Sequence, residues 1–394
     1  MVNDRLALLR DYPFRRLSSL LAGIDPPRDV EPVVMSIGEP QHPYPDFVPK
    51  VLAQYAGLWS KYPPTTGTLE FREAVKNWLT TRYSLPNGMI DANRNILPVA
   101  GTREALFSVA LLTVPTTKHG ARPTVLIPDP FYQIYSGAAI MAGAEPVYVP
   151  TTEDTGFLPD FGALPIDQLE RAVLAYLCTP SNPQGAVASL DQLEDHIKLA
   201  RELDFTLAVD ECYCEIYFDT PPPGIIQACR SAQGNLDKII GFHSLSKRSN
   251  VPGLRSGFVA GDSKLIGEFA RLRQYTGGAS PGPILATATE LWKDETPVEA
   301  NRRLYQEKFF DARTILGKHP YYYQPDGGFY LWLNVGDGEA TTQRLWNSAA
   351  VKVMPGAYLS KEGDSPPGKA YIRLALVNDR ANTAEALERM AVFL

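Results

Sequence analysis

Cysteine is scarce in this sequence, with four in 394 residues. The spacing of these cysteines does not match a zinc site, so we expect free thiols in a reducing compartment. Two of them, Cys212 and Cys214, are predicted to lie within a strand. The five histidines also lack the spacing of metal ligands, and the sequence predicts no metal centre.

Long apolar runs and tracts of basic residues are missing as well. No apolar run approaches the roughly 18 residues that a membrane-spanning helix needs. The formal net charge is −6, and Lys and Arg are scattered along the chain, which argues against nucleic-acid binding. The opening stretch "MVNDRLALLRDYPF" lacks the apolar segment of a secretory signal. We therefore expect a cytoplasmic protein that binds neither membranes nor nucleic acid.

Apolar runs alternate with helical patterns from Thr68 onward. Phe71, Val75 and Trp78 fall on one face of a predicted helix, with Thr68 as its N-cap. A second helix is predicted over 189–204, beginning at a capping box. The predicted strands are "NILPVAG", "PTVLIPD", "EPVYVP", "LAYLCTP", "FTLAVDE", "KIIGFHS" and "SGFVAGD". This alternation predicts an α/β fold with a mainly parallel sheet covered by helices on both faces.

The chain divides into three predicted regions. Proline-rich stretches such as "DPPRDVEPV" and "GEPQHPYPDF" indicate an extended N-terminal arm over 1–45. The large domain is predicted over 46–285. A smaller α+β domain is predicted over 286–394, with strands in "GGFYLWLNV" and "AYIRLAL", and the arm is expected to pack against it.

Polar residues gather where the predicted strands end. In open α/β sheets, ligands bind beyond the carboxyl ends of the strands, so these residues are expected to converge on one site. They are Gly101, Thr102, Arg103, Asn182, Asp210, Ser244, Ser246 and Lys247.

Each of these features has an ordinary structural alternative. The stretch 101–103 could simply begin a helix, although such a start suits a phosphate. Asp210 ends an apolar strand and could form a buried ion pair. Lys247 could be a surface charge, and Arg255 could pair with a carboxylate or hold a phosphate. The sequence contains no Walker loop, GxSxG or HExxH motif that would favour another chemistry.

A lysine, an aspartate and an anion-binding helix start together suit one cofactor, pyridoxal 5'-phosphate. This cofactor needs an amine for its Schiff base, a carboxylate beside its ring nitrogen and a cradle for its phosphate.

The sequence resembles the fold-type I, class I/II aminotransferases over nearly its whole length. The motifs that carry the resemblance are "YPPTTGTLEFREA", "GTREAL", "DPFYQIYSGAAIMAGA", "TPSNPQGAV", "DECYCEIYF", "SLSKRSNVPGLRSGF" and "YIRLAL". One departure is Gln184 in "SNPQG", where the family usually has threonine.

The resemblance implies roles for individual residues. Lys247 would bind the cofactor and shuttle the proton of the substrate, and Asp210 would pair with the ring nitrogen. Around the ring, Asn182 and Tyr213 would bond its phenolic oxygen and Tyr132 would stack on it. The residues implied at the phosphate are Gly101, Thr102, Arg103, Ser244, Ser246, Arg255 and, from the neighbouring subunit of a homodimer, Tyr62. The residues implied at the substrate are Arg373, which would hold the α-carboxylate, Asn182 and Gly38.

Within the family, the sequence is most similar to the bacterial N-succinyldiaminopimelate aminotransferases of lysine biosynthesis. That similarity implies an amino donor, N-succinyl-L,L-2,6-diaminopimelate, and a 2-oxo acid acceptor, 2-oxoglutarate. The distal carboxylates of this donor need a cation or N–H donors, and Arg28, Arg271 and Arg273 are the candidates. The alternatives are an aspartate or aromatic aminotransferase, a pyridoxal-phosphate-dependent C–S β-lyase, and a non-catalytic binding protein that keeps the fold.

Overall fold

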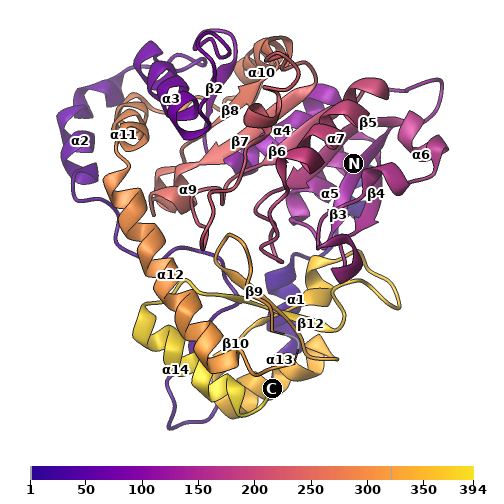
Figure 1. The fold of residues 1–394 in the computed structure, drawn as a ribbon, viewed down its shortest axis with the longest axis vertical. Helices are drawn as coiled ribbons and strands as arrows, with labels where there is room; N and C mark the ends of the chain where they lie inside the picture. Colours follow the sequence, from indigo (N-terminus) through magenta and orange to yellow (C-terminus); the bar gives the residue numbers. More distant parts are fainter. Residues whose placement is uncertain (1, 321) are drawn as a thin grey trace.

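The structure is a computed structural model that describes residues 2–320 and 322–394. It has a large part built on a wide sheet and a small part built on two narrow sheets, and α12 runs from one to the other (Figure 1). Within the described residues, no helix is long and apolar enough to cross a bilayer.

The wide sheet has seven strands among the described residues, in the order β2-β8-β7-β6-β5-β3-β4. Strands β4, β3, β5, β6 and β7 pair in parallel, and β8 runs antiparallel to both β7 and β2. The strands are β2 Ile96–Val99, β3 Thr124–Asp129, β4 Glu145–Pro150, β5 Ala172–Cys178, β6 Thr206–Asp210, β7 Ile239–Ser244 and β8 Gly257–Gly261. All seven predicted strands are confirmed, as is the mainly parallel sheet.

The helices of the large part cover both faces of this sheet. They are α2 Val48–Gln54, α3 Leu69–Arg82, α4 Thr102–Thr113, α5 Gln133–Ala142, α6 Ile166–Glu170, α7 Leu190–Glu202, α8 Ile225–Ala228, α9 Leu245–Arg248, α10 Ser263–Thr276 and α11 Gly282–Lys293. Side chains alternate along each strand: Leu207 and Val209 of β6 join the core under α3, α7 and α11, whereas Ala208 joins the core under α4, α5 and α10.

The local signals read from the sequence appear in the helices. The side chain of Thr68 accepts a hydrogen bond from the Phe71 amide, and the predicted face of α3 is buried. The capping box of α7 is present, with Ser189 and Gln192 bonded reciprocally. These two helix starts are confirmed.

The small part combines the C-terminal quarter of the chain with the arm. Its helices are α1 Pro13–Leu20, α12 Thr296–Leu316, α13 Gly338–Ala349 and α14 Arg380–Ala391. Its strands are β1 Val33–Val34, β9 Tyr330–Asn334, β10 Val351–Lys352, β11 Met354–Pro355 and β12 Tyr371–Ala375. The arm packs against these elements: β1 pairs with β10, and Leu17 of α1 is buried beside Trp332.

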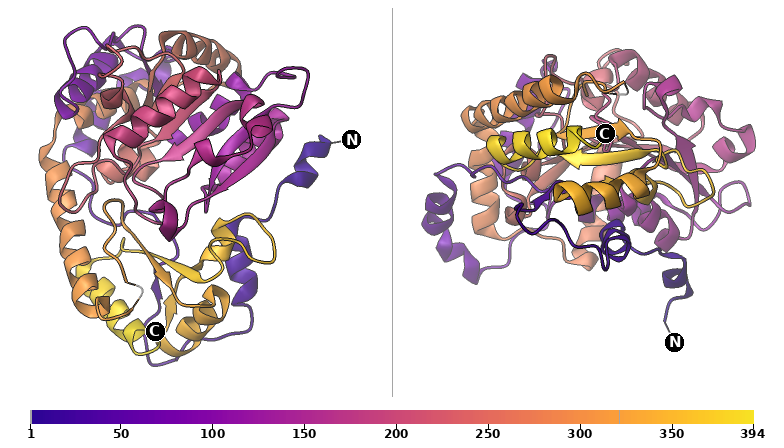
Figure 2. Two further views of the ribbon diagram at one scale, coloured as in Figure 1. Left: turned by 45° about the vertical axis from the view of Figure 1, so that its right-hand side comes forward. Right: turned by 90° about the horizontal axis from the view of Figure 1, so that it is seen from below.

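Two details of the chain differ from the sequence interpretation. The segment containing Cys212 and Cys214 is a turn that follows β6, not a strand, because β6 ends at Asp210. The first residues of the arm extend away from α1 (Figure 2), and Arg5 donates a hydrogen bond of 3.0 Å to the carbonyl oxygen of Met141 in α5. The domain boundaries at 45/46 and 285/286 stay predictions, and α11 crosses the second of them.

Candidate active site

A cavity of about 580 Å³ lies where the arm, the large part and the small part meet. Most of the predicted site residues line it, although they come from distant parts of the chain. These residues are Gly38, Thr102, Arg103, Tyr132, Asn182, Asp210, Tyr213, Ser244, Ser246, Lys247, Arg255 and Arg373.

The amine of Lys247 is buried in this cavity. Lys247 lies in α9, which begins at Ser244, and the Ser244 hydroxyl accepts a hydrogen bond of 3.1 Å from the Ser246 amide. The Lys247 amine donates a hydrogen bond of 2.6 Å to the carbonyl oxygen of Gly38. Burial lowers the pKa of the amine to about 8. A substantial fraction of this amine is therefore neutral, and so nucleophilic, close to physiological pH.

Asp210 is a buried carboxylate without a cationic partner. It accepts hydrogen bonds from the Tyr135 hydroxyl at 2.8 Å and from the Cys212 amide at 3.2 Å. Among the described residues, no lysine or arginine acts on its pKa, which burial raises. The ion-pair alternative is therefore not supported within the chain, and the carboxylate is suited to a cationic group that enters the cavity.

The start of α4 and Arg255 form a cradle for an anion. Gly101 precedes α4 with a φ of +80°, and a side chain there would collide with the Arg255 guanidinium. Arg255 donates to the Ser246 hydroxyl at 3.4 Å, and the Thr102 hydroxyl lies 3.0 Å from the sulfur of Cys212. Backbone amides at a helix start, a guanidinium and hydroxyls are donors that suit a phosphate.

Arg373 reaches the cavity from β12 in the small part. Its guanidinium donates to the Asn182 side-chain oxygen at 3.0 Å and to the Ser36 carbonyl oxygen at 2.7 Å. Its Cζ lies 4.5 Å from the centre of the Tyr330 ring, and its buried Nε has no hydrogen-bond partner among the described residues. Arg373 therefore has donor capacity left for a carboxylate. Its neighbours Ile372 and Leu374 face the opposite core, as the strand alternation predicts.

Two tyrosines border the same space. The Tyr132 hydroxyl accepts a hydrogen bond of 2.7 Å from Nε of Arg103. The Tyr213 hydroxyl lies 3.1 Å from the Tyr330 hydroxyl, which places a phenol–phenol pair between the turn after β6 and the small part. Gln184, the departure from the family pattern, is buried beside this region and donates to the Thr151 hydroxyl at 2.7 Å.

The side chains that line the cavity have the chemistry that pyridoxal 5'-phosphate requires. It presents a buried amine on Lys247, a carboxylate on Asp210 that lacks a cation, and a cradle of donors at Arg255. These are the three groups that the cofactor requires.

Some predicted residues lie outside the cavity. Tyr62 is fully exposed and does not line it within one chain. The three arginines proposed for the distal end of the substrate also do not line it, which corrects that prediction for a single chain. Arg28 is exposed, Arg271 pairs with Glu268 at 3.3 Å, and Arg273 is buried against Glu104 at 3.2 Å.

The arm contributes lining residues that the sequence did not indicate. Tyr12 and Phe14 lie at the start of α1, and Ile37 and Glu39 flank Gly38 in the loop after β1. Their place depends on the packing of the arm against distant strands. A local sequence signal for this role is lacking.

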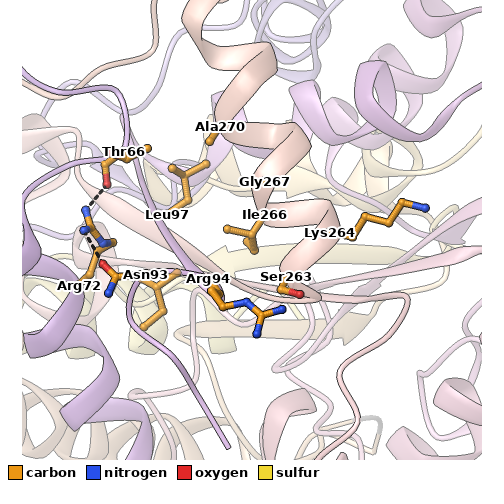
Figure 3. Close-up of a pocket in the computed structure, with 11 residues that line it drawn as sticks. Thr66, Arg72, Asn93, Arg94, Leu97, Ser263, Lys264, Ile266, Gly267 and Ala270 are labelled. Carbon is orange, nitrogen blue, oxygen red and sulfur yellow. Dashed lines mark hydrogen bonds between the residues drawn. The ribbon is translucent and has the colours of Figure 1, made fainter.

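A second cavity, also of about 580 Å³, lies away from these residues and is lined by Arg94, Ser263 and Lys264 among others (Figure 3). Arg72 at its edge donates to the carbonyl oxygens of Thr66 and Gly67, each at 2.9 Å, and to the Asn93 side chain at 3.0 Å. Arg72 therefore fixes the end of the loop that carries Tyr62.

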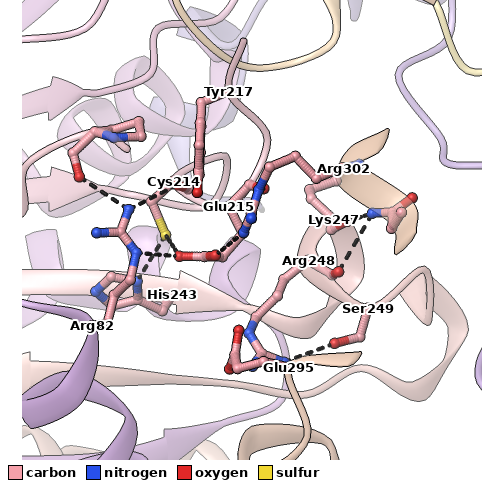
Figure 4. Close-up of polar contacts among 12 residues, drawn as sticks. Arg82, Cys214, Glu215, Tyr217, His243, Lys247, Arg248, Ser249, Glu295 and Arg302 are labelled. Carbon is pink, nitrogen blue, oxygen red and sulfur yellow. Dashed lines mark hydrogen bonds and ion pairs between the residues drawn. The ribbon is translucent and has the colours of Figure 1, made fainter. Parts of the chain in front are cut away.

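A buried ionic cluster braces the turn after β6. Glu215 lies between two guanidiniums (Figure 4), with Nε of Arg82 at 2.6 Å and Nη2 of Arg302 at 2.7 Å. Arg82 ends α3 and Arg302 belongs to α12. The cluster therefore joins the large part to the helix that leads into the small part.

Comparisons with known proteins agree with this geometry. Residues 30–390 match the family model for aminotransferase class I and II. An LL-diaminopimelate aminotransferase of Moorella thermoacetica is 30% identical over 98% of this chain and 96% of its own length. An aminotransferase from Neisseria meningitidis with a known crystal structure has 41% sequence identity to this chain, and its TM-score is 0.95 over 100% of both chains. A probable N-succinyldiaminopimelate aminotransferase from Thermus thermophilus is 26% identical, with a TM-score of 0.82 over 97% of this chain and 100% of that one.

Proposed function

The chain belongs to the class I and II aminotransferases, a family that depends on pyridoxal 5'-phosphate, and we propose that it transfers the amino group of N-succinyl-L,L-2,6-diaminopimelate to 2-oxoglutarate. The observation that carries the proposal is that Lys247, Asp210 and Arg373 line one cavity. A protein that only binds ligands needs no buried amine of lowered pKa in one cavity with a carboxylate and a guanidinium.

Each of these residues has a proposed task. When bound, the cofactor supplies an electron sink for charge that develops at the substrate α-carbon. Asp210 keeps the ring nitrogen protonated, and Arg255, Ser246 and Thr102 hold the phosphate. Arg373 binds the α-carboxylate of the substrate. The Lys247 amine, once it is free, takes the proton from the substrate α-carbon.

Further cofactor contacts are proposed from the same cavity. Tyr132 stacks on the ring, Asn182 and Tyr213 bond its phenolic oxygen, and Ser244 and Arg103 complete the phosphate site. Gly101 keeps the turn before α4 tight, because its φ of +80° is unfavourable for other residues.

The proposed donor is supported by similarity in sequence and structure. The Moorella relative is named for LL-diaminopimelate and the Thermus relative for N-succinyldiaminopimelate. These names point to a diaminopimelate-type donor and to lysine biosynthesis. The second candidate donor is unmodified LL-diaminopimelate, which the curated relative at 30% identity favours.

The proposed assembly is a homodimer in the cytoplasm, with sites shared between subunits. Tyr62 is fully exposed in one chain, and the side chains of Trp59 and Tyr275 are also largely exposed. Aromatic side chains are enriched at protein–protein interfaces relative to the rest of a protein surface. In the proposed dimer, Tyr62 reaches the phosphate of the neighbouring subunit.

A panel of amino donors with 2-oxoglutarate tests the proposed function. The expected result is glutamate formation with kcat/KM highest for N-succinyl-L,L-2,6-diaminopimelate, ahead of LL-diaminopimelate, aspartate and an aromatic amino acid. A site built for polar groups rejects donors that lack them by roughly 10⁴-fold. If aspartate or an aromatic donor matches the succinylated one, the proposed substrate is wrong. Release of pyruvate and a thiol from a cysteine conjugate, without glutamate, would instead indicate the β-lyase.

A further inference from the structure

A side chain of α12, Asn301, reaches the main chain of Lys247 and joins it to other polar side chains. Asn301 is 4% exposed, and its side-chain nitrogen lies 3.2 Å from the carbonyl oxygen of Lys247 and 3.4 Å from that of Arg248. Its side-chain oxygen lies 2.8 Å from Nδ2 of Asn250 and 2.7 Å from Nδ1 of His42.

These carbonyl oxygens need an external donor. Helix α9 ends at Arg248, and the last carbonyls of a helix lack donors from the helix itself. Asn301 supplies that donor. The Arg248 side chain anchors the same turn, because it donates to the Ser249 hydroxyl at 3.1 Å (Figure 4) and to the Leu291 carbonyl oxygen at 2.7 Å. The position of the lysine backbone therefore depends on contacts with α11 and α12.

Lys308 sets the direction of these hydrogen bonds. Its buried amine lies 2.8 Å from Nε2 of His42 and donates to the Asn378 carbonyl oxygen, also at 2.8 Å. Burial lowers the pKa of Lys308 to about 7. In its ammonium form the group has only donors, so Nε2 of His42 then accepts and the ring proton resides on Nδ1. That proton is donated to the Asn301 oxygen, which leaves the Asn301 nitrogen to donate to the carbonyl of Lys247.

Burial and the charge of Lys308 favour this arrangement. Both lower the pKa of His42, burial being the larger cause, so the ring stays neutral and keeps one acceptor nitrogen. The ring also lies 4.5 Å from that of Tyr305, which stacks on Phe329 at 5.4 Å. The Lys247 amine lies 5.3 Å from the centre of the Phe329 ring.

The loop that carries His42 contacts Lys247 at two points. Its Gly38 carbonyl oxygen accepts from the lysine amine, and its His42 reaches the lysine main chain through Asn301. We propose that His42 is a positioning residue for Lys247, acting through Asn301, and that Lys308 fixes the tautomer of the His42 ring. This inference rests on the proposed function, in which Lys247 carries the cofactor.

Two substitutions of His42 separate its two nitrogens. His42→Asn places an amide nitrogen near the position of Nδ1 and keeps a donor for Asn301. His42→Gln places its amide near the position of Nε2 and loses that donor. The readout is the pH titration of the cofactor's absorption in the holoenzyme without substrate, together with kcat and KM and the melting temperature.

The expected result is a difference between the two variants. Loss of one hydrogen bond corresponds to roughly a 3- to 10-fold change in an equilibrium or rate constant. His42→Gln should therefore move the titration midpoint by about 0.5 to 1 pH unit. It should also lower kcat by about 3- to 10-fold, with KM nearly unchanged. His42→Asn should keep the wild-type midpoint and most of kcat. Equal titration midpoints in the wild-type protein and the two variants would overturn the inference. It would also be overturned if both variants shifted the midpoint equally and lowered the melting temperature equally.

A second variant covers the case in which His42→Gln does not fold. Lys308→Met removes a buried amine without adding a polar group and frees the His42 tautomer, so it should move the midpoint as well. An unmoved midpoint in folded Lys308→Met contradicts the role of Lys308. Borohydride reduction of the wild-type holoenzyme tests the proposed function separately from this inference. If the cofactor is attached to a residue other than Lys247, the proposed function is wrong. If it is attached to Lys247 but the titration midpoints of the variants do not move, only this inference is wrong.

Discussion

The amine of Lys247 donates a hydrogen bond of 2.6 Å to the carbonyl oxygen of Gly38, a residue 209 positions earlier in the chain. This contact joins α9 of the large part, which follows β7, to the loop after β1 in the arm. It holds the amine within the cavity. The reactivity of this amine is therefore the first property to test.

Burial lowers the pKa of Lys247 to about 8, and the positive charges of Arg373 and Arg255 act in the same direction. The amine is mostly protonated below pH 8 and mostly neutral above it. In the apoprotein, the rate of labelling of Lys247 by an amine-specific reagent should therefore rise with a midpoint near pH 8, read by peptide mass mapping. N-acetyl-lysine is the reference, and Arg373→Met should move the midpoint upward. A midpoint equal to that of the reference would contradict the burial of the amine.

Asp210→Asn tests the carboxylate at the end of β6. The amide keeps the shape of the side chain but removes the charge that favours a protonated ring nitrogen. We expect cofactor to remain bound while kcat falls by roughly 100-fold or more, the scale of losing a key electrostatic group. Tyr135→Phe is the matched control, because it removes one hydrogen bond to the carboxylate and should cost about 3- to 10-fold. Near wild-type turnover in Asp210→Asn would show that Asp210 is structural.

Tyr62 tests the shared site. Tyr62→Phe removes a hydroxyl that is fully exposed in one chain and is proposed to bond the phosphate of the partner. A hydrogen bond to a charged group is worth about 1.5–3 kcal/mol, so cofactor affinity should fall by roughly tenfold or more. The exposed Tyr275 provides the control variant Tyr275→Phe. Sedimentation should show a dimer for all three proteins, and a fully active monomer would exclude the shared site.

Glu215→Gln tests the ionic cluster in Figure 4. The side chain of Glu215 is 2% exposed, and removing its charge leaves Arg82 and Arg302 without a counter-ion. Breaking a buried pair in this way costs about 3–5 kcal/mol in the free energy of unfolding, which chemical denaturation can measure. Glu307→Gln is the control, since its ion pair with Arg380 is exposed and screened by solvent. Equal stability of the two variants would contradict the bracing role of Glu215.

The sequence predicted the parts of the fold that local patterns determine. The seven strands of the wide sheet and the starts of α3 and α7 carry their signals in consecutive residues. The convergence of Asn182, Asp210 and Lys247 followed from the rule that parallel strands end at one edge of a sheet. The turn after β6 was mistaken for a strand, since its apolar and aromatic residues also suit a strand.

The rest of the site depends on contacts between distant segments. Tyr12 and Glu39 reach the cavity only because the arm packs against the small part. Arg273 looked like a free cation in the sequence, but it is 1% exposed and paired with Glu104. The contacts of Lys247 with Gly38 and Asn301 likewise join residues that are far apart in the chain. Periodicity and motif spacing do not record such contacts.

Borohydride reduction of the holoenzyme followed by peptide mass mapping identifies the lysine that carries the cofactor. The reduction fixes the cofactor to the lysine that binds it, and that lysine can then be identified by its peptide. We expect a pyridoxyl group on Lys247, in the peptide that contains α9. A pyridoxyl group on Lys238 or Lys264, with Lys247 unmodified, would contradict this expectation.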